Sequence, residues 1–374
     1  MKRDMTRRAA VALIAALALA VAAGAKTVKV QGFPAGSQDP EVLNAGLPAT
    51  EYGYHPSDDS SWGESWSMQA ANAAGDYVYV LMSVSNYHPF HQHAGTVDIF
   101  YCKASGEKHK SHGEFLSDKV RADPAKVQVD IGGHTFSGAH PTYSLHVRFP
   151  DLAADLTFRV PTPDLRLGQD FLRFGARGER LWNLTILGPR AQVAGAIAVN
   201  GRTIPFSGLG YMDHGWSTEK LYKFSRTWYV LRLVQDDFSL NAVQMNFRDG
   251  YDPRTTQAIY ITEGDRVIAN SGALRLVPSG GKREERSGVL LPESYAVSYE
   301  SGGTKVAGML KMTRLVEGLN VLDQLSPVLR KVISALVVDP WQFRFAGEAD
   351  LTVTRDGTTR HVTGPVVGEV HSYK

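Results

Sequence analysis

The sequence predicts an all-β protein built from two antiparallel β units. Runs of β-branched and aromatic residues recur about every ten residues, and turns containing Gly, Asp or Pro separate them. In one run, Tyr143, Leu145, Val147 and Phe149 alternate with polar residues, as in a half-buried strand. With 374 residues the chain exceeds what one hydrophobic core usually spans. We therefore expect two β domains, over residues 26–200 and 201–374.

The first domain begins with a lead-in, residues 26–66, that is rich in Pro, Gly, Ser and Asp. Strands are then expected over residues 63–70, 77–84, 96–101, 125–131, 134–136, 143–149 and 154–160. Asn200-Gly201 is the strongest signal for a two-residue hairpin in the chain. We place the boundary between the two domains at this turn.

The second domain repeats the strand pattern without a residue-level repeat. Strands are expected over residues 228–233, 238–247, 257–262, 273–277, 294–300, 308–315, 341–346, 350–355, 360–363 and 368–373. In the second of these, the apolar set shifts from Phe238, Leu240 and Ala242 to Val243 and Met245. This shift suggests a β-bulge that changes the inward face.

One helix is expected before the last strands. Apolar residues recur at three- and four-residue steps from Leu319 to Leu336. A helix packed on the mouth of a barrel is favoured over one lying on a membrane, because Arg330 and Lys331 are its only adjacent basic pair.

The first 25 residues have the pattern of a secretory signal peptide. Four basic residues precede an uncharged run, residues 9–23, and Ala23-Gly24-Ala25 supplies small residues for cleavage. The expected location is periplasmic or secreted. Thr6-Arg7-Arg8 leaves twin-arginine export open as an alternative.

Charge and cysteine content exclude several classes. Without the signal peptide, which carries four basic residues and one acidic one, 36 Lys and Arg face 37 Asp and Glu. This balance gives no general affinity for nucleic acid or anionic lipid. The single cysteine, Cys102, excludes an intramolecular disulfide and a multi-cysteine metal site, and we expect it buried on a strand.

The segment from Phe206 to Trp216 concentrates groups that carry chemistry. Its glycines permit positive φ or a close backbone approach. Asp213 beside His214 could supply an acid that protonates a carbon-carbon double bond. The aromatic residues around this pair would stabilise a developing cation, and they are Tyr211, Trp216, Tyr222 and Trp228. The same pair could instead satisfy buried backbone groups where two domains meet.

A second cluster, His88-Pro-Phe-His91-Gln-His93, lies near His109 and His112. Because no Asp, Glu or Cys stands beside it at a ligand spacing, we favour a polar loop at the rim of a pocket over a metal site. There is no Gly-x-Ser-x-Gly motif and no Walker motif. The sequence therefore predicts neither a cofactor nor a metal.

Two sets of motifs resemble a known superfamily. Gly208-x-Gly-Tyr-x-Asp-His-x-Trp216 is similar to the signature of carotenoid 1,2-hydratases and their AttH-like relatives. A second set resembles the fungal survival-factor (oxidative stress survival) family, and it comprises Asn86, Gly188-Pro-Arg190, Val193-x-Gly195, Arg226-x-Trp228 and Ala242-Val-Gln-Met245. The final Gly368-Glu-Val370 resembles the closing strand of both families.

The resemblance implies two tandem lipocalin-like β-barrels with a pocket for a long apolar molecule. It assigns catalysis to His214 and Trp216, next to Asp213, but the Tyr and Asp that follow in the hydratases are unmatched in Phe238–Asn246. The survival-factor relatives are thought to bind lipids. We assign the pocket wall to Tyr211, Tyr222, Arg226, Trp228, Gln244 and His91.

Three hypotheses follow from these observations. The first is an exported protein that binds a hydrophobic small molecule, a lipid or isoprenoid, in a β-walled cavity. The second is a cofactor-independent hydratase, isomerase or cyclase that acts on an isoprenoid or polyketide alkene, with Asp213 and His214 as the acid pair. The third is an envelope interaction protein whose barrels are filled by their own side chains. Peripheral membrane contact and the oligomeric state stay open.

Overall fold

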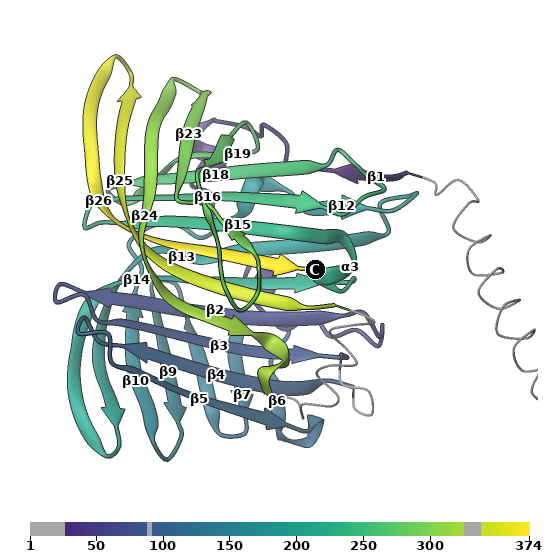
Figure 1. Cartoon of the computed structure of the whole chain (residues 1–374), viewed down its shortest axis with the longest axis vertical. Coiled ribbons are helices and arrows are strands. Elements are labelled where there is room, and N and C mark those ends of the chain that lie inside the picture. Colours follow the sequence, from purple (N-terminus) through teal and green to yellow (C-terminus); the bar gives the residue numbers. More distant parts are fainter. Residues whose placement is uncertain (1–26, 88–91, 325–337) are drawn as a thin grey trace, which may run out of the picture.

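The computed structural model describes residues 27–87, 92–324 and 338–374. Nearly all secondary structure in these ranges is β, which confirms the predicted all-β class. The strands form two large curved sheets that lie one against the other (Figure 1). Pairing is antiparallel in both sheets, except where β1 runs parallel to β17.

The first sheet uses the N-terminal part of the chain. Its main path, in spatial order, is β5 (Lys108–Phe115), β4 (Ala94–Cys102), β3 (Tyr77–Ser85), β2 (Gly63–Asn72), β14 (Arg202–Ser217), β13 (Arg180–Val199), β10 (Leu152–Arg159), β9 (Thr142–Arg148), β8 (His134–Ala139), β7 (Val127–Ile131) and β6 (Val120–Ala122). Four short strands join it off this path, and they are β1 (Val28–Gln31), β11 (Leu165–Arg166), β12 (Leu172–Phe174) and β17 (Tyr251–Asp252).

The second sheet uses the C-terminal part. Its order is β19 (Arg266–Ser271), β18 (Thr255–Glu263), β16 (Phe238–Phe247), β15 (Ser225–Val234), β26 (Thr358–Tyr373), β25 (Pro340–Arg355), β24 (Thr304–Asn320), β23 (Ser294–Ser301) and β20 (Arg275–Ser279). A separate small pair consists of β21 (Lys282–Arg283) and β22 (Leu290–Leu291). The described helices are single turns, and they are α2 (Pro40–Leu43), α3 (Leu221–Phe224) and 3₁₀ turns at Ala49–Glu51, Ser117–Lys119, Leu167–Gln169 and Val321–Gln324.

The predicted hairpin is present between β13 and β14. Asn200 and Gly201 both have positive φ, 49° and 79°, as a type I′ turn requires. However, β14 continues the first sheet by pairing with both β13 and β2. The chain passes to the second sheet between Ser217 and Ser225, later than the expected boundary near residue 200.

The described residues form three large apolar cores and a fourth, smaller cluster that includes Tyr79 and Phe100. The first fills the concave side of the first sheet and includes Trp66 and Phe158. The second fills the second sheet and includes Leu240 and Tyr295. The third, which we call the seam, lies where the two sheets meet and includes Tyr211. Strands next to the seam are therefore buried on both faces.

Two sequence-based predictions need correction or restriction. The bulge expected in β16 is wrong, since β16 pairs with β18 without a register shift and the one shift in its pairing with β15 lies on β15, between Ser225 and Thr227. Its apolar set changes because one face lies in the second core and the other in the seam. The first residues of the predicted helix instead form the end of β24 and a 3₁₀ turn, Val321–Gln324. The remainder of the prediction falls on residues 325–337, which lie outside the described residues.

Two further points concern single features. Cys102 is buried on β4 with a free thiol, as predicted.

Among the described residues, no helix has the length and apolar character that a transmembrane helix needs. The predicted signal peptide, residues 1–25, also falls outside the described part of the chain.

Candidate ligand cleft and buried acid-base cluster

Strand β14 carries the hydratase-like signature and separates two different environments. Neighbouring residues of a strand point to opposite faces. Met212 and His214 point toward the first core, whereas Tyr211 and Asp213 point toward the seam. The structure therefore does not bring Asp213 and His214 together as an acid pair.

The glycines of β14 allow close backbone approach rather than positive φ. A Cβ at Gly208 would lie 2.1 Å from the carbonyl oxygen of Ala71, and one at Gly210 would lie 2.7 Å from that of Gln69. Both contacts are shorter than real Cβ contacts. Glycine at these positions lets β14 pair tightly with β2, the strand that supplies the partners of His214 and Asp213.

His214 is completely buried and hydrogen-bonded through both ring nitrogens. Its Nε2 lies 2.7 Å from Oε1 of Glu64, and its Nδ1 lies 3.2 Å from the carbonyl oxygen of Glu51. Trp66 stacks on the ring at 4.8 Å with an interplanar angle of 3°. Because a carbonyl oxygen can only accept, Nδ1 carries a proton and donates it to Glu51.

Glu64 is the carboxylate partner of His214. It lies two residues before Trp66, which is opposite His214 in the β2–β14 ladder, so Glu64 and His214 are diagonal neighbours on one face. Glu64 also accepts from the backbone N–H of His55, and His55 Nδ1 lies 3.3 Å from Oε1. We call His55, Glu64 and His214 the inner cluster.

The ionisation of Glu64 follows from these contacts. Burial by itself raises the pKa of Glu64, but the hydrogen bonds and charges of His214 and His55 outweigh it and hold the pKa below its ordinary value. The Glu64 side chain is thus a buried carboxylate that is hydrogen-bonded to the buried His214 ring. A carboxylate and an imidazole in such contact are groups that can take part in proton transfer.

Asp213 belongs to a different group of charges in the seam. Its Oδ1 accepts from the Ser67 hydroxyl at 2.5 Å, and its Oδ2 lies 3.4 Å from Nη2 of Arg232. Arg232 also donates to Glu369 at 3.0 Å, and its guanidinium lies 4.4 Å from the centroid of the Tyr211 ring. When the amide oxygen of Gln69 faces Arg232, it accepts from Arg232 Nε at 3.2 Å and from Nη1 at 3.1 Å.

Further charged residues contact Glu369. Arg344 lies 3.8 Å from Glu369, pairs with Glu317 and stacks at 3.7 Å on the Tyr79 ring. His371 Nε2 lies 3.2 Å from the other Glu369 oxygen. We call Asp213, Arg232, Glu317, Arg344 and Glu369 the seam network. Its basic and acidic groups compensate each other within a buried region.

The two carboxyls that contact Arg232 respond oppositely to this environment. Burial raises the pKa of Asp213, and the charge of Arg232 offsets this only in part. Burial also acts to raise the pKa of Glu369, but Arg232, His371 and Arg344 together bring that pKa well below its ordinary value. Glu369 is the firmly ionised centre of the network.

We expect stability to fall in acid because of Glu369 and Glu64. A carboxyl with a lowered folded-state pKa contributes stability above its ordinary value, here 4.5, and loses it as the pH falls toward the folded value. Asp213 acts in the opposite sense, since its raised pKa means that protonation relieves a cost. Urea unfolding between pH 7 and pH 3 measures the sum.

The matched comparison uses Glu369→Gln and Glu300→Gln. Glu300 is exposed on β23, so its replacement leaves the acid-induced loss as in the wild type. Glu369→Gln makes the unfolding free energy fall less between pH 5 and pH 3. Equal slopes in all three proteins would contradict the account.

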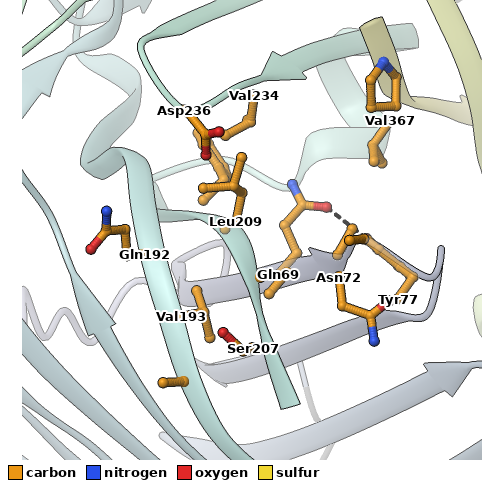
Figure 2. A pocket seen from close by; sticks show the side chains of 18 of the residues that line it. Gln69, Asn72, Tyr77, Gln192, Val193, Ser207, Leu209, Val234, Asp236 and Val367 are labelled. Carbon is orange, nitrogen blue, oxygen red and sulfur yellow. Dashed lines mark hydrogen bonds between the residues drawn. The ribbon is translucent and has the colours of Figure 1, made fainter.

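A cleft of about 740 Å³ opens between the two sheets beside the seam network. Figure 2 shows side chains from both sheets around it. Leu209 lines it from β14, Val234 from β15 and Val367 from β26. Arg232 and Tyr211 are buried at its inner end, where the Gln69 amide that accepts from Arg232 donates to the Tyr77 hydroxyl at 2.6 Å. Arg159, Gln192 and Asp236 add polar groups.

Of the residues assigned to the pocket wall, Tyr211 lines this cleft. Trp228 instead stacks on His371 at 4.8 Å, and Gln244 bonds to Gln257 and Asn246 within the second sheet. Arg226 is exposed, and Tyr222 lies on α3 with its carbonyl accepting from Arg248. His91 lies outside the described residues.

Trp216 and the other predicted histidines have separate surroundings. Trp216 stacks on His55 at 4.9 Å, beside the inner cluster. His93 hydrogen-bonds to Tyr54 at 2.7 Å, while His109 and His112 pair with carboxylates on the outer strands. The histidine segment thus does not form one cluster with His109 and His112 in the described residues.

Sequence reasoning missed Glu64, His55 and Arg232. Glu64 lies on the same face of a predicted strand as Trp66, Met68 and Ala70, and a carboxylate among inward-facing apolar residues is a signal of a buried partner. Arg232 likewise interrupts an apolar strand. No comparable local signal marks His55, which precedes Pro56 in the turn-rich lead-in.

The fold and its seam cleft define a class: two lipocalin-like β units packed face to face. Solved structures with this fold include an AttH-like protein from Nitrosomonas europaea, with a TM-score of 0.61, 16% identity, and coverage of 88% of this chain and 100% of that chain. CghA, solved with Sch210972, has a TM-score of 0.60 and 11% identity, covering 92% and 98%. Kievitone hydratase from Nectria haematococca has a TM-score of 0.55 and 12% identity, covering 91% and 97%.

These similarities confirm the predicted lipocalin-like fold and the resemblance to the AttH-like and hydratase group at the level of structure. At such identities they show the fold alone. No protein-family model matches the chain, and no curated protein matches it by sequence.

Proposed function

We propose that this protein is an exported carrier that binds a neutral hydrophobic small molecule, a lipid or isoprenoid, in the cleft between its two sheets. The observation that carries the proposal is the cleft itself. Its volume of about 740 Å³ lies within the usual range of small-molecule pockets, and apolar side chains line most of it.

The chemistry of the walls favours an uncharged ligand. Leu209, Val234 and Val367 offer apolar surface, whose burial contributes roughly 25 cal/mol per Å². Arg232 is the cation at the inner end, but Asp213 and Glu369 already accept its hydrogen bonds. An anionic headgroup would have to displace a buried carboxylate, whereas a hydroxyl or carbonyl group would not.

A neutral fluorescent probe tests the binding. N-phenyl-1-naphthylamine should bind the full chain saturably at one site, and unlabelled long-chain alcohols or isoprenoid alcohols should displace it. Matching fatty acids should compete less well, because Arg232, the buried cation at the inner end of the cleft, already pairs with two carboxylates. Absence of saturable binding, or a clear preference for the acids, would overturn the proposal.

Export rests on the first 25 residues, and fractionation of cells that express the full chain tests it. The expected result is a protein outside the cytoplasm whose N-terminal sequence begins near Lys26. A cytoplasmic protein that retains Met1 would contradict export without affecting the proposed binding.

A second candidate function is hydration or isomerisation of an alkene without a cofactor. The contact between His214 and Glu64, rather than Asp213, favours it, because protonation of a double bond needs a proton-donating group of this kind. The solved kievitone hydratase shares the fold. Incubation of the extracted ligand in D₂O should give a product with deuterium at the protonated carbon with the wild type but not with His214→Ala, and H₂¹⁸O adds an oxygen label only if the reaction is a hydration. Unlabelled ligand in both would leave binding as the function.

A further inference from the structure

The inner cluster contains three metal-ligand groups that converge on one point. His55 Nδ1, a Glu64 oxygen and His214 Nε2 all lie within 4.8 Å of one another. The three residues come from the N-terminal lead-in, β2 and β14, so the fold rather than local spacing assembles them. They lie on the face of β14 opposite to Asp213 and the seam network.

We infer that the inner cluster is a binding site for one divalent transition-metal ion, with Zn²⁺ the best match. Two imidazoles and one carboxylate are a donor set that zinc uses in proteins. A four-coordinate zinc ion with bonds of about 2.0–2.1 Å holds its ligand atoms about 3.3 Å apart. His55 Nδ1 and Glu64 Oε1 are already at 3.3 Å, and the 2.7 Å between Oε1 and His214 Nε2 must open by roughly 0.6 Å.

The surroundings hold the ligands in the orientation that a metal requires. A metal-bound histidine usually donates its other ring N–H to a carbonyl or carboxylate. His214 Nδ1 does so to the Glu51 carbonyl, which leaves Nε2 for the ion. The backbone N–H of His55 donates to Glu64 Oε2 at 2.9 Å and so fixes the carboxylate.

Stacked indoles fix the planes of both imidazoles. Trp66 lies on His214 at 4.8 Å, and Trp216 lies on His55 at 4.9 Å with an interplanar angle of 16°. Glu64 and His214 are fully buried, whereas the His55 side chain is 27% exposed. His55 therefore marks the route by which an ion and a fourth ligand, a water molecule, would enter.

Metal binding and proton donation exclude each other at this site. Zn²⁺ takes the lone pair of His214 Nε2, so this nitrogen carries no proton while the ion is bound. A zinc ion at the inner cluster would therefore prevent His214 from acting as an acid through Nε2.

The test uses the full chain stripped with a chelator and titrated with ZnCl₂ by calorimetry. We expect one site per chain, and binding at least tenfold weaker in His55→Ala and in Glu64→Gln. CoCl₂ should give an intense visible band, typical of low coordination, in the wild type but not in His55→Ala or Glu64→Gln.

His146→Ala is the matched control, since His146 is an exposed histidine paired with Asp155 on the outer face of the first sheet. It should bind zinc like the wild type. Circular dichroism verifies that each variant is folded. If the buried substitution Glu64→Gln unfolds the protein, His55→Ala still tests the site, because His55 is partly exposed and its loss disturbs the core less. No saturable site in the wild type, or unchanged affinity in folded His55→Ala, would overturn the inference.

Discussion

Replacement of Glu369 by glutamine is expected to lower the free energy of unfolding at pH 7 by about 3–5 kcal/mol, the usual cost of removing one partner of a buried ion pair. Glu369 accepts from Arg232 at 3.0 Å and lies 3.8 Å from Arg344, and all three side chains are buried. Glutamine keeps the size but not the charge, so two guanidinium groups lose their shared carboxylate.

Asp213→Asn is the matched variant and should cost clearly less. Burial raises the pKa of Asp213, so its ionised form gains less from Arg232 than it loses by leaving water. Asparagine can still accept from the Ser67 hydroxyl, which lies 2.5 Å from Oδ1. Urea unfolding of both variants decides the matter, and a larger loss in Asp213→Asn than in Glu369→Gln would refute the assignment of Glu369 as the centre of the network.

Leu209→Trp is expected to weaken probe binding in the cleft at least tenfold. Leu209 is half-buried and reaches the cleft from β14, and an indole there would occupy volume opposite Val234 and Val367. The loss of ligand contact surface accounts for the size of the effect, since tenfold corresponds to about 1.4 kcal/mol, or some 50–60 Å² of apolar contact. Titration with N-phenyl-1-naphthylamine measures it.

Val277→Trp is the control for this substitution. Val277 is an apolar residue on β20 with 41% of its surface exposed, and it is not among the residues that line the cleft. The added indole should leave probe affinity unchanged. Equal affinity of wild-type protein and folded Leu209→Trp would place the probe elsewhere.

Local patterns in the sequence were enough to predict the strands and one turn. Alternation identified β9, and Asn200-Gly201 identified the β13–β14 hairpin, because period and turn chemistry depend on adjacent residues. The face change in β16 was misinterpreted, because burial on both sides of a strand looks like a shift of the inward face. Its cause, the seam, is formed by distant segments.

The same distinction applies to the candidate sites. Asp213 and His214 are adjacent in sequence, yet they point to opposite faces of β14. The acid pair that the hydratase hypothesis required is therefore not formed. The partner of His214 is 150 residues away, and only the register of β14 on β2 reveals it. The cleft could not be foreseen either, since Leu209 and Val367 belong to different sheets.

The central claim is that the seam cleft holds a neutral hydrophobic molecule, and mass spectrometry of organic extracts tests it most directly. Wild-type protein, Leu209→Trp and Val277→Trp would be purified from the native host and extracted in parallel. The account predicts a neutral lipid or isoprenoid near one per chain in the wild type and in Val277→Trp, and its loss from Leu209→Trp. An extract of the wild type without such a molecule, or the same molecule retained in full by folded Leu209→Trp, would contradict it.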